Sequence, residues 1–334
     1  MAHDWLLVET LGEEPVVVAQ GSQPKNLVPL TVFLRRNPHV ADVVQAVNDT
    51  AASATAQTSY TTKRDRLIRA EPVLMSDGRV HGVHVWLGPV GVSPPQRSVP
   101  GPLVWNLTTG VATDTPQSLA NSGMDPSSEK THGRTFAEDL PTRDLNPSEI
   151  EVLSMAVKSR PDYIYCNTWD VTDHAGELIT VSFVSRTNLE KVDDGAEHML
   201  ARAMNWRSER AAPVVAPDLL AQRILDGLAR PGSYRALVDV NTWTLLKWID
   251  EPCPLYDWRG RDGSSWVHPG DTPLIAAMTS ELDSGMTQRV LRLPGHDTDW
   301  VAIHVTVHRV ELEPDTYAGL ITLRAPTEAE AAHR

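Results

Sequence analysis

The sequence has only two cysteines, Cys166 and Cys253, and no apolar run near the length of about 18 residues that a membrane-spanning helix needs. Two cysteines cannot build a disulfide framework or, on their own, a cysteine-based zinc site. The amino terminus has no basic region followed by an apolar stretch, so no secretory signal is expected. These absences favour a cytoplasmic protein with no membrane span.

Basic residues are also in short supply. The chain has 30 Lys and Arg against 43 Asp and Glu, a net charge of −13, and no part of it has an excess of positive charge. A nucleic-acid backbone or an anionic membrane surface would be repelled rather than attracted. We therefore expect no nucleic-acid partner.

Catalytic motifs are missing as well. The sequence contains no phosphate-binding GxxxxGK[ST], no GxGxxG after a strand and no GxSxG elbow. The histidine pairs His81 with His84 and His304 with His308 supply too few ligands for a metal. No residue matches a haem or flavin ligand. We therefore expect no catalytic residue, no metal site and no cofactor. An unrecognised hydrolase or transferase is the least favoured of three interpretations of the function, after the sensor and the scaffold described below.

What the chain does have is one pattern that occurs three times in its 334 residues. Each copy opens on a short strand pair with a tight turn, predicted within 6–19, 103–113 and 236–248. A helix follows, beginning at a proline after a capping residue, at Asn37-Pro38, Asn146-Pro147 and Thr272-Pro273. A longer hairpin completes each copy, within 67–87, 163–184 and 300–323. From first to last strand each copy measures about 80 residues.

The three copies differ in detail. The first and third leave room for one more strand, at 58–62 and 288–292, whereas the second is followed by a trailing helix predicted over 196–210. Residues 113–135 are rich in Ser, Thr, Gly and Pro and predict a mobile loop. The predicted modules span 1–97, 98–215 and 216–328, the last with a leading helix, and a tail follows at 329–334. Three separate cores are expected, built around the pairs Val43 and Val85, Leu153 and Val181, and Met278 and Ile321.

A strand hairpin, a helical middle and a meander of long strands resemble the PAS fold and its relative, the GAF fold. The whole chain is similar to mycobacterial triple sensor-domain proteins with PAS, GAF and PAS modules in tandem. This resemblance implies an α+β fold of three tandem PAS/GAF-like modules, each an antiparallel sheet of five or six strands with helices packed on it. Many such sensors carry a catalytic output domain. Here the third module extends to Pro326, so we expect signalling through a protein partner.

Tryptophan gathers in the third module. Five of the ten tryptophans lie there, and several occupy the helical middle, where PAS domains hold their ligand pocket. Indole rings pack protein cores and also line small-molecule sites, so both interpretations stay open. The candidate ligand-binding residues are Trp243, Trp248, Trp258, Trp266 and His268.

A predicted helix joins the second and third modules. Its apolar residues Leu220, Ile224, Leu225 and Leu228 fall on one broad face that needs a covering surface. Module three, module two or a second subunit of a homodimer can supply that surface. The sequence thus predicts a non-enzymatic sensor or adaptor for a small ligand or protein partner. The alternative is a structural interaction scaffold with filled cores and no ligand.

Overall fold

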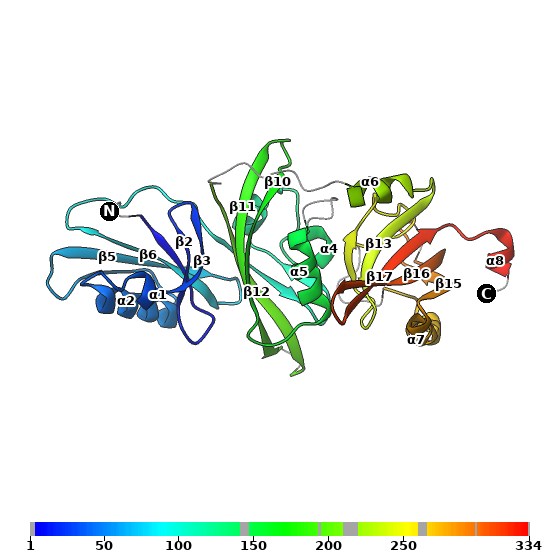
Figure 1. Cartoon of the computed structure of the whole chain (residues 1–334), viewed down its shortest axis with the longest axis horizontal. Coiled ribbons are helices and arrows are strands. Elements are labelled where there is room, and N and C mark those ends of the chain that lie inside the picture. The colour runs from blue at the N-terminus through cyan, green and yellow to red at the C-terminus, as the bar shows by residue number, and fades with distance from the viewer. Residues whose placement is uncertain are drawn as a thin grey trace.

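The computed structural model describes residues 4–140, 147–192, 195–209, 220–259, 266–297 and 299–332. Three antiparallel sheets follow one another in a row, each carrying short helices (Figure 1). The chain is mostly sheet, with less helix than an α+β fold implies. No helix among the described residues is both long and apolar enough to cross a membrane.

The N-terminal module is a six-stranded sheet with the order β3-β2-β1-β6-β5-β4. Its elements are β1 (Leu6–Glu9), β2 (Val16–Gln20), β3 (Gln23–Pro29), α1 (Leu30–Phe33), α2 (Val40–Ser53), β4 (Gln57–Tyr60), β5 (Arg66–Leu74) and β6 (Val80–Pro89). Helix α2 packs on β5 and β6, and Val43 and Val85 share one hydrophobic cluster, as expected.

The middle module has the order β10-β11-β12-β7-β8-β9. Its elements are β7 (Gly101–Asn106), β8 (Val111–Thr113), α3 (Pro116–Asn121), β9 (Arg134–Thr135), α4 (Phe136–Asp139), α5 (Pro147–Val157), β10 (Ile164–Thr172), β11 (Leu178–Lys191) and β12 (Glu197–Arg207).

The C-terminal module has the order β14-β13-β17-β16-β15. Its elements are α6 (Leu220–Gly227), β13 (Ser233–Asp239), β14 (Leu245–Trp248), η1 (Pro269–Asp271), α7 (Thr272–Glu281), η2 (Leu282–Ser284), β15 (Met286–Leu293), β16 (Val301–Glu313), β17 (Thr316–Arg324) and α8 (Glu328–Ala332).

The three sheets share one strand order, which confirms the repeat. In each sheet the opening strand lies between its hairpin partner and the last strand of the meander, as in β2-β1-β6-β5-β4, β8-β7-β12-β11-β10 and β14-β13-β17-β16-β15. The extra strands expected in the first and third copies are β4 and β15.

The predicted trailing helix over 196–210 is wrong, because residues 197–207 form strand β12. This segment is rich in Ala, Met, Leu and Arg, all good helix formers. Tertiary pairing overrides that propensity, since β12 lies between β11 and β7 and bonds to both. The last strand of the middle module is therefore β12 and not β11, and this copy is longer than the other two.

The expectation of a continuous loop over 113–135 is also wrong for residues 116–121, which form α3. Thr115 caps this helix through its side chain, with Pro116 at the first helical position. Leu119 is fully buried, and α3 packs on β7 and β12.

The cores are not fully separate. Leu153 and Val181 share a cluster that also contains Leu237 and Leu246 of the C-terminal module. The reason is helix α5, which buries residues on several faces and packs against β16 and β17 as well as against its own sheet. In Figure 1, α5 stands between the middle and C-terminal sheets. Met278 and Ile321 lie in a third cluster, as expected.

Candidate ligand cleft and module interfaces

The N-terminal module holds an open cleft of about 970 Å³ on the face of its sheet that carries α1 and α2. Clefts that bind small molecules commonly measure about 300–1,000 Å³. The apolar side chains that line it come from the sheet, from α1 and from α2, and include Leu6, Val28, Phe33, Val43, Val85 and Leu87. The cleft is thus a preformed space with an apolar floor.

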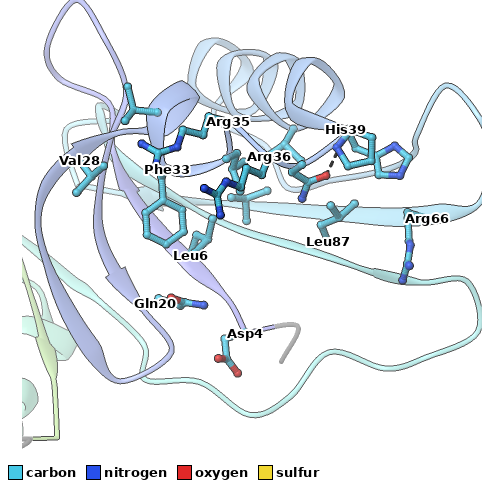
Figure 2. Close-up of a pocket in the computed structure, with 16 residues that line it drawn as sticks. Asp4, Leu6, Gln20, Val28, Phe33, Arg35, Arg36, His39, Arg66 and Leu87 are labelled. Carbon is cyan, nitrogen blue, oxygen red and sulfur yellow. Dashed lines mark hydrogen bonds between the residues drawn. The ribbon is translucent and has the colours of Figure 1, made fainter. Parts of the chain in front are cut away.

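Three arginines give this cleft a positive rim. Arg35 and Arg36 lie on the segment after α1, and Arg66 begins β5 beyond Leu87, on the His39 side of the cleft (Figure 2). Among the described residues, the side chains of Arg35 and Arg36 form no ion pair with a carboxylate. Asp4 is the one acidic residue among the side chains that line the described cleft. A local excess of positive charge in a chain of net charge −13 favours an anion at this site.

His39 also lines the cleft, on the same side as Arg66 (Figure 2), and two carboxylates outside the cleft lie close to its ring. Its ring nitrogens lie 3.8 Å from Asp42 Oδ2 and 3.5 Å from Asp65 Oδ2. The Asp42 carboxylate accepts hydrogen bonds from the Thr62 hydroxyl at 2.5 Å and the Thr62 amide at 3.1 Å, which lower its pKa. These contacts join the start of α2 to the β4–β5 turn and fix the shape of the wall.

Strand β1 connects the cleft to the middle module. Side chains alternate across a strand, so Leu6 faces the cleft while Leu7 faces the opposite side. Leu7 belongs to a cluster that spans the two modules, made of Leu7, Val18, Ala19, Val73, Val184, Met204 and Trp206. At the end of the strand, Glu9 accepts two hydrogen bonds from Arg186, at 2.9 and 3.0 Å.

A second polar contact crosses the same interface at His81, which is fully buried. His81 Nδ1 lies 2.8 Å from Ala203 O, and Arg202 Nη1 lies 3.2 Å from His81 Nε2. Arginine can only donate, so Nε2 accepts and Nδ1 carries the proton. Burial is the largest cause that lowers the pKa of His81, to about 4, and the Arg202 charge adds to it. The interface therefore contains a neutral imidazole.

The described tryptophans of the C-terminal module fill its core. Trp243 and Trp248 are buried, and Trp243 donates its Nε1 hydrogen to Thr279 at 2.8 Å. Trp266 stacks on Trp243 with ring centres 5.5 Å apart. The space left within this core is about 10 Å³, barely room for one water. His268 accepts a hydrogen bond from the Gly270 amide at 2.9 Å, so its described role is local.

The outer edges of Trp258 and Trp266 do line a space, but it lies between modules. A cleft of about 350 Å³ is lined by the middle-module turn at Gly110 and by the C-terminal turn at Thr244. The two turns approach so closely that a Cβ at Gly110, which has φ +71°, would collide with Thr244. The predicted ligand-binding role of these tryptophans within the third module stays a prediction.

Only part of the predicted apolar face of helix α6 is covered by the rest of the protein. Leu225 packs against the cluster shared by the middle and C-terminal modules, and its carbonyl accepts from Arg235 Nη2 at 2.8 Å. Ile224 and Leu228 are 53% and 64% exposed. Leu220 begins the helix, and its side chain lies outside the described residues. The coupling role of this helix stays a prediction.

The middle module buries a charged cluster against the C-terminal module. Arg134 Nη1 donates to Asp114 at 2.5 Å and also to Asp139, which accepts from Trp105 Nε1 at 2.5 Å. Burial, together with the Asp114 charge, raises the pKa of Asp139 to about 7. The neighbouring cavity measures only about 40 Å³, which suits water and not a larger ligand.

A basic cleft in the first module, filled cores in the other two and continuous packing between neighbours define a protein of three coupled sheet modules. Family models of the N-terminal, middle and C-terminal domains of Rv3651-like proteins match residues 4–96, 99–208 and 218–334. The chain therefore belongs to the Rv3651-like family. No curated protein sequence matches the chain.

Solved structures add one close relative. An uncharacterized protein from Mycobacterium tuberculosis is 55% identical, with a TM-score of 0.91 over 99% of both chains. Two distant likenesses are a sensory box histidine kinase/response regulator from Burkholderia thailandensis and an RNA-binding light-oxygen-voltage receptor. The first is 17% identical over 39% of this chain and 84% of that one, with a TM-score of 0.21. The second is 8% identical over 67% of this chain and 93% of that one, with a TM-score of 0.23. Neither carries an argument about this chain.

Proposed function

We propose that this protein is a non-enzymatic sensor of PAS/GAF type that binds a small molecule in the N-terminal cleft. The observation that carries the proposal is the open cleft of about 970 Å³ on the first module, whereas the spaces inside the cores of the other two measure about 40 and 10 Å³. The first module receives the ligand. The middle and C-terminal modules transmit or display the result to a protein partner in the cytoplasm, where the two free thiols would stay reduced.

The chemistry of the lining supports binding rather than reaction. No Ser, Thr or Cys is among the described residues that line the cleft, so no hydroxyl or thiol nucleophile stands there. The arginines on the rim bind charge, and the apolar floor binds a hydrocarbon or ring.

The signal would leave the cleft through β1. A ligand that shifts Leu6 moves the same strand whose Leu7 and Glu9 pack on the middle module. Packed interfaces respond to small shifts in discrete steps, so an ångström-scale change in β1 can alter how the modules sit.

Native mass spectrometry of the full chain purified from its own host tests the binding step. We expect a retained mass of a few hundred daltons, by comparison with drug-sized ligands of such clefts. The mass should be lost in Leu87→Trp, which fills the cleft, and kept in Leu178→Trp, a matched change at a side chain that is 75% exposed on β11. A retained mass that both variants keep would place the ligand elsewhere. No retained mass in any form would favour the alternative, a structural scaffold.

A further inference from the structure

We infer that the ligand of the N-terminal cleft is an amphipathic anion: an apolar chain or ring that ends in a carboxylate or phosphate. This inference rests on the proposed function and names the ligand class for the same site. The cleft joins two kinds of surface that such a molecule would meet together.

The apolar part of the ligand would lie on the sheet. Leu6 of β1 and Val85 and Leu87 of β6 form a continuous floor, since β1 and β6 are paired neighbours with Leu6 opposite Val85. Phe33 reaches from α1 toward Leu6 and closes this floor on one side (Figure 2). Each methylene covered here should tighten binding by roughly fourfold, so a chain of several carbons would dominate the affinity.

The charged end would lie among the arginines. Arg36 projects from the segment after α1 into the space above the floor, and Arg66 stands on β5 beyond Leu87 (Figure 2). Guanidinium groups bind carboxylates and phosphates through paired N–H donors. A neutral alcohol or an amine on the ligand lacks the two charged oxygens that would accept both donors. His39 is already engaged by Asp42 and Asp65, and the Arg66 charge also interacts with Asp65, so Arg36 is the group best placed to hold the anion.

The opposite end of the cleft carries Asp4 and Gln20. A negative charge at that end would repel a second anionic group on the ligand. The ligand is thus expected to carry its charge at one end only, which distinguishes it from a dicarboxylate.

Isothermal titration of the delipidated full chain tests the ligand class with four probes that share one ten-carbon chain: decanoate, decyl phosphate, 1-decanol and decylamine. We expect the better anion to bind at least about tenfold more tightly than decanol, the effect of one charge-assisted contact, and decylamine to bind most weakly. The order of decanoate and decyl phosphate tells which headgroup fits.

Variants separate the ligand class from the proposed function. Arg36→Gln should weaken the anion by about tenfold and leave decanol within about twofold, and Arg66→Gln, whose charge already interacts with Asp65, should weaken it less. Arg223→Gln, on an exposed residue of α6, should change neither. Equal binding of decanol and both anions, lost together in Leu87→Trp, would overturn the anion and leave the cleft as a binding site. Anion binding unchanged in the Arg36, Arg66 and Leu87 variants would overturn the inference, as would the absence of binding by any probe in a protein whose native ligand depends on Leu87.

Discussion

The ion pair between Lys247 and Glu149 makes a quantitative prediction about how the middle and C-terminal modules are joined. Lys247 of β14 and Glu149 of α5 lie at the centre of the shared core, and both side chains are only 2% exposed. A buried ion pair offsets its own desolvation only while both charges are present. Lys247→Met keeps the length of the side chain but leaves the Glu149 carboxylate buried opposite a thioether.

The expected cost of Lys247→Met is about 3–5 kcal/mol in the free energy of unfolding, and Glu149→Gln should cost a similar amount. The double variant Lys247→Met/Glu149→Leu should recover most of this loss, since two apolar side chains can pack where the two charges stood. The coupling energy between the two sites is therefore expected to be several kcal/mol, far above the usual additivity error of about 0.5 kcal/mol.

Urea unfolding followed by tryptophan fluorescence measures this cycle, because the C-terminal module is rich in tryptophan. The control is Asp283→Asn, which removes the exposed pair of Arg309 and Asp283 at 3.4 Å and should cost less than about 1 kcal/mol. If Lys247→Met costs no more than this control, or if the double variant loses the sum of the single losses, then the pair does not hold the interface.

Three further predictions concern burial and pH. Leu119→Ala should cost about 2–5 kcal/mol, since Leu119 is fully buried in α3, and a loss below about 0.5 kcal/mol in urea unfolding would return 116–121 to a loop. Burial lowers the folded-state pKa of His81 to about 4, against 6.5 in the unfolded chain, so its contribution is complete above pH 6.5 and about 3 kcal/mol is lost as pH falls from 6.5 through about 4. The pKa of His84 is lowered to about 4 by burial as well and adds a loss over the same window. His81→Asn should therefore reduce but not abolish the fall in a pH series of urea midpoints, and His132→Asn, at an exposed site, should leave it unchanged. The pKa of Asp139 is raised from 3.8 to about 7, so its contribution to folding stability is complete below pH 3.8 and is lost as pH rises through about 7. Hydrogen exchange at α4 should therefore speed up over that pH range in the parent but not in Asp139→Asn.

The order of elements could be predicted from the sequence because each carries a local signal. Proline marks the approach to the helices α2, α5 and α7, which begin at Val40, Pro147 and Thr272, and alternating apolar residues mark the hairpins. The predicted caps Asn37 and Thr272 are wrong, because the structure places His39 and Asp271 at the N-cap positions of α2 and α7. The same helix signal is present at Thr115-Pro116, where α3 begins, but the Ser- and Gly-rich residues around it favour a loop. The sequence pattern therefore does not predict α3.

Strand β12 could not be predicted, because its identity depends on partners far away in the chain. Met199 to Met204 are residues of high helix propensity, and only the free edges of β11 and β7 select the extended form. The cores shared between modules depend on the same kind of information, since nothing in the sequence of α5 says which sheet its second apolar face will meet.

The site is the harder part. Aromatic content favours a pocket in the C-terminal module, yet Trp243 and Trp248 fill their own core. The cleft in the N-terminal module arises from the way α1 and residues 34–39 stand off the sheet, which is a tertiary property. The adjacent pair Arg35-Arg36 before Asn37-Pro38 is the one local signal that could have drawn attention to it.

The central claim is that occupancy of the N-terminal cleft is read through β1 by the middle module. Hydrogen-exchange mass spectrometry of the host-purified chain, before and after delipidation on a hydrophobic resin, tests it most directly. We expect emptying the cleft to speed exchange in residues 28–43, in β1, and in β12 across the interface. Exchange that is unchanged in residues 28–43 and β1, or that speeds up there and stays unchanged in β12, would contradict the account.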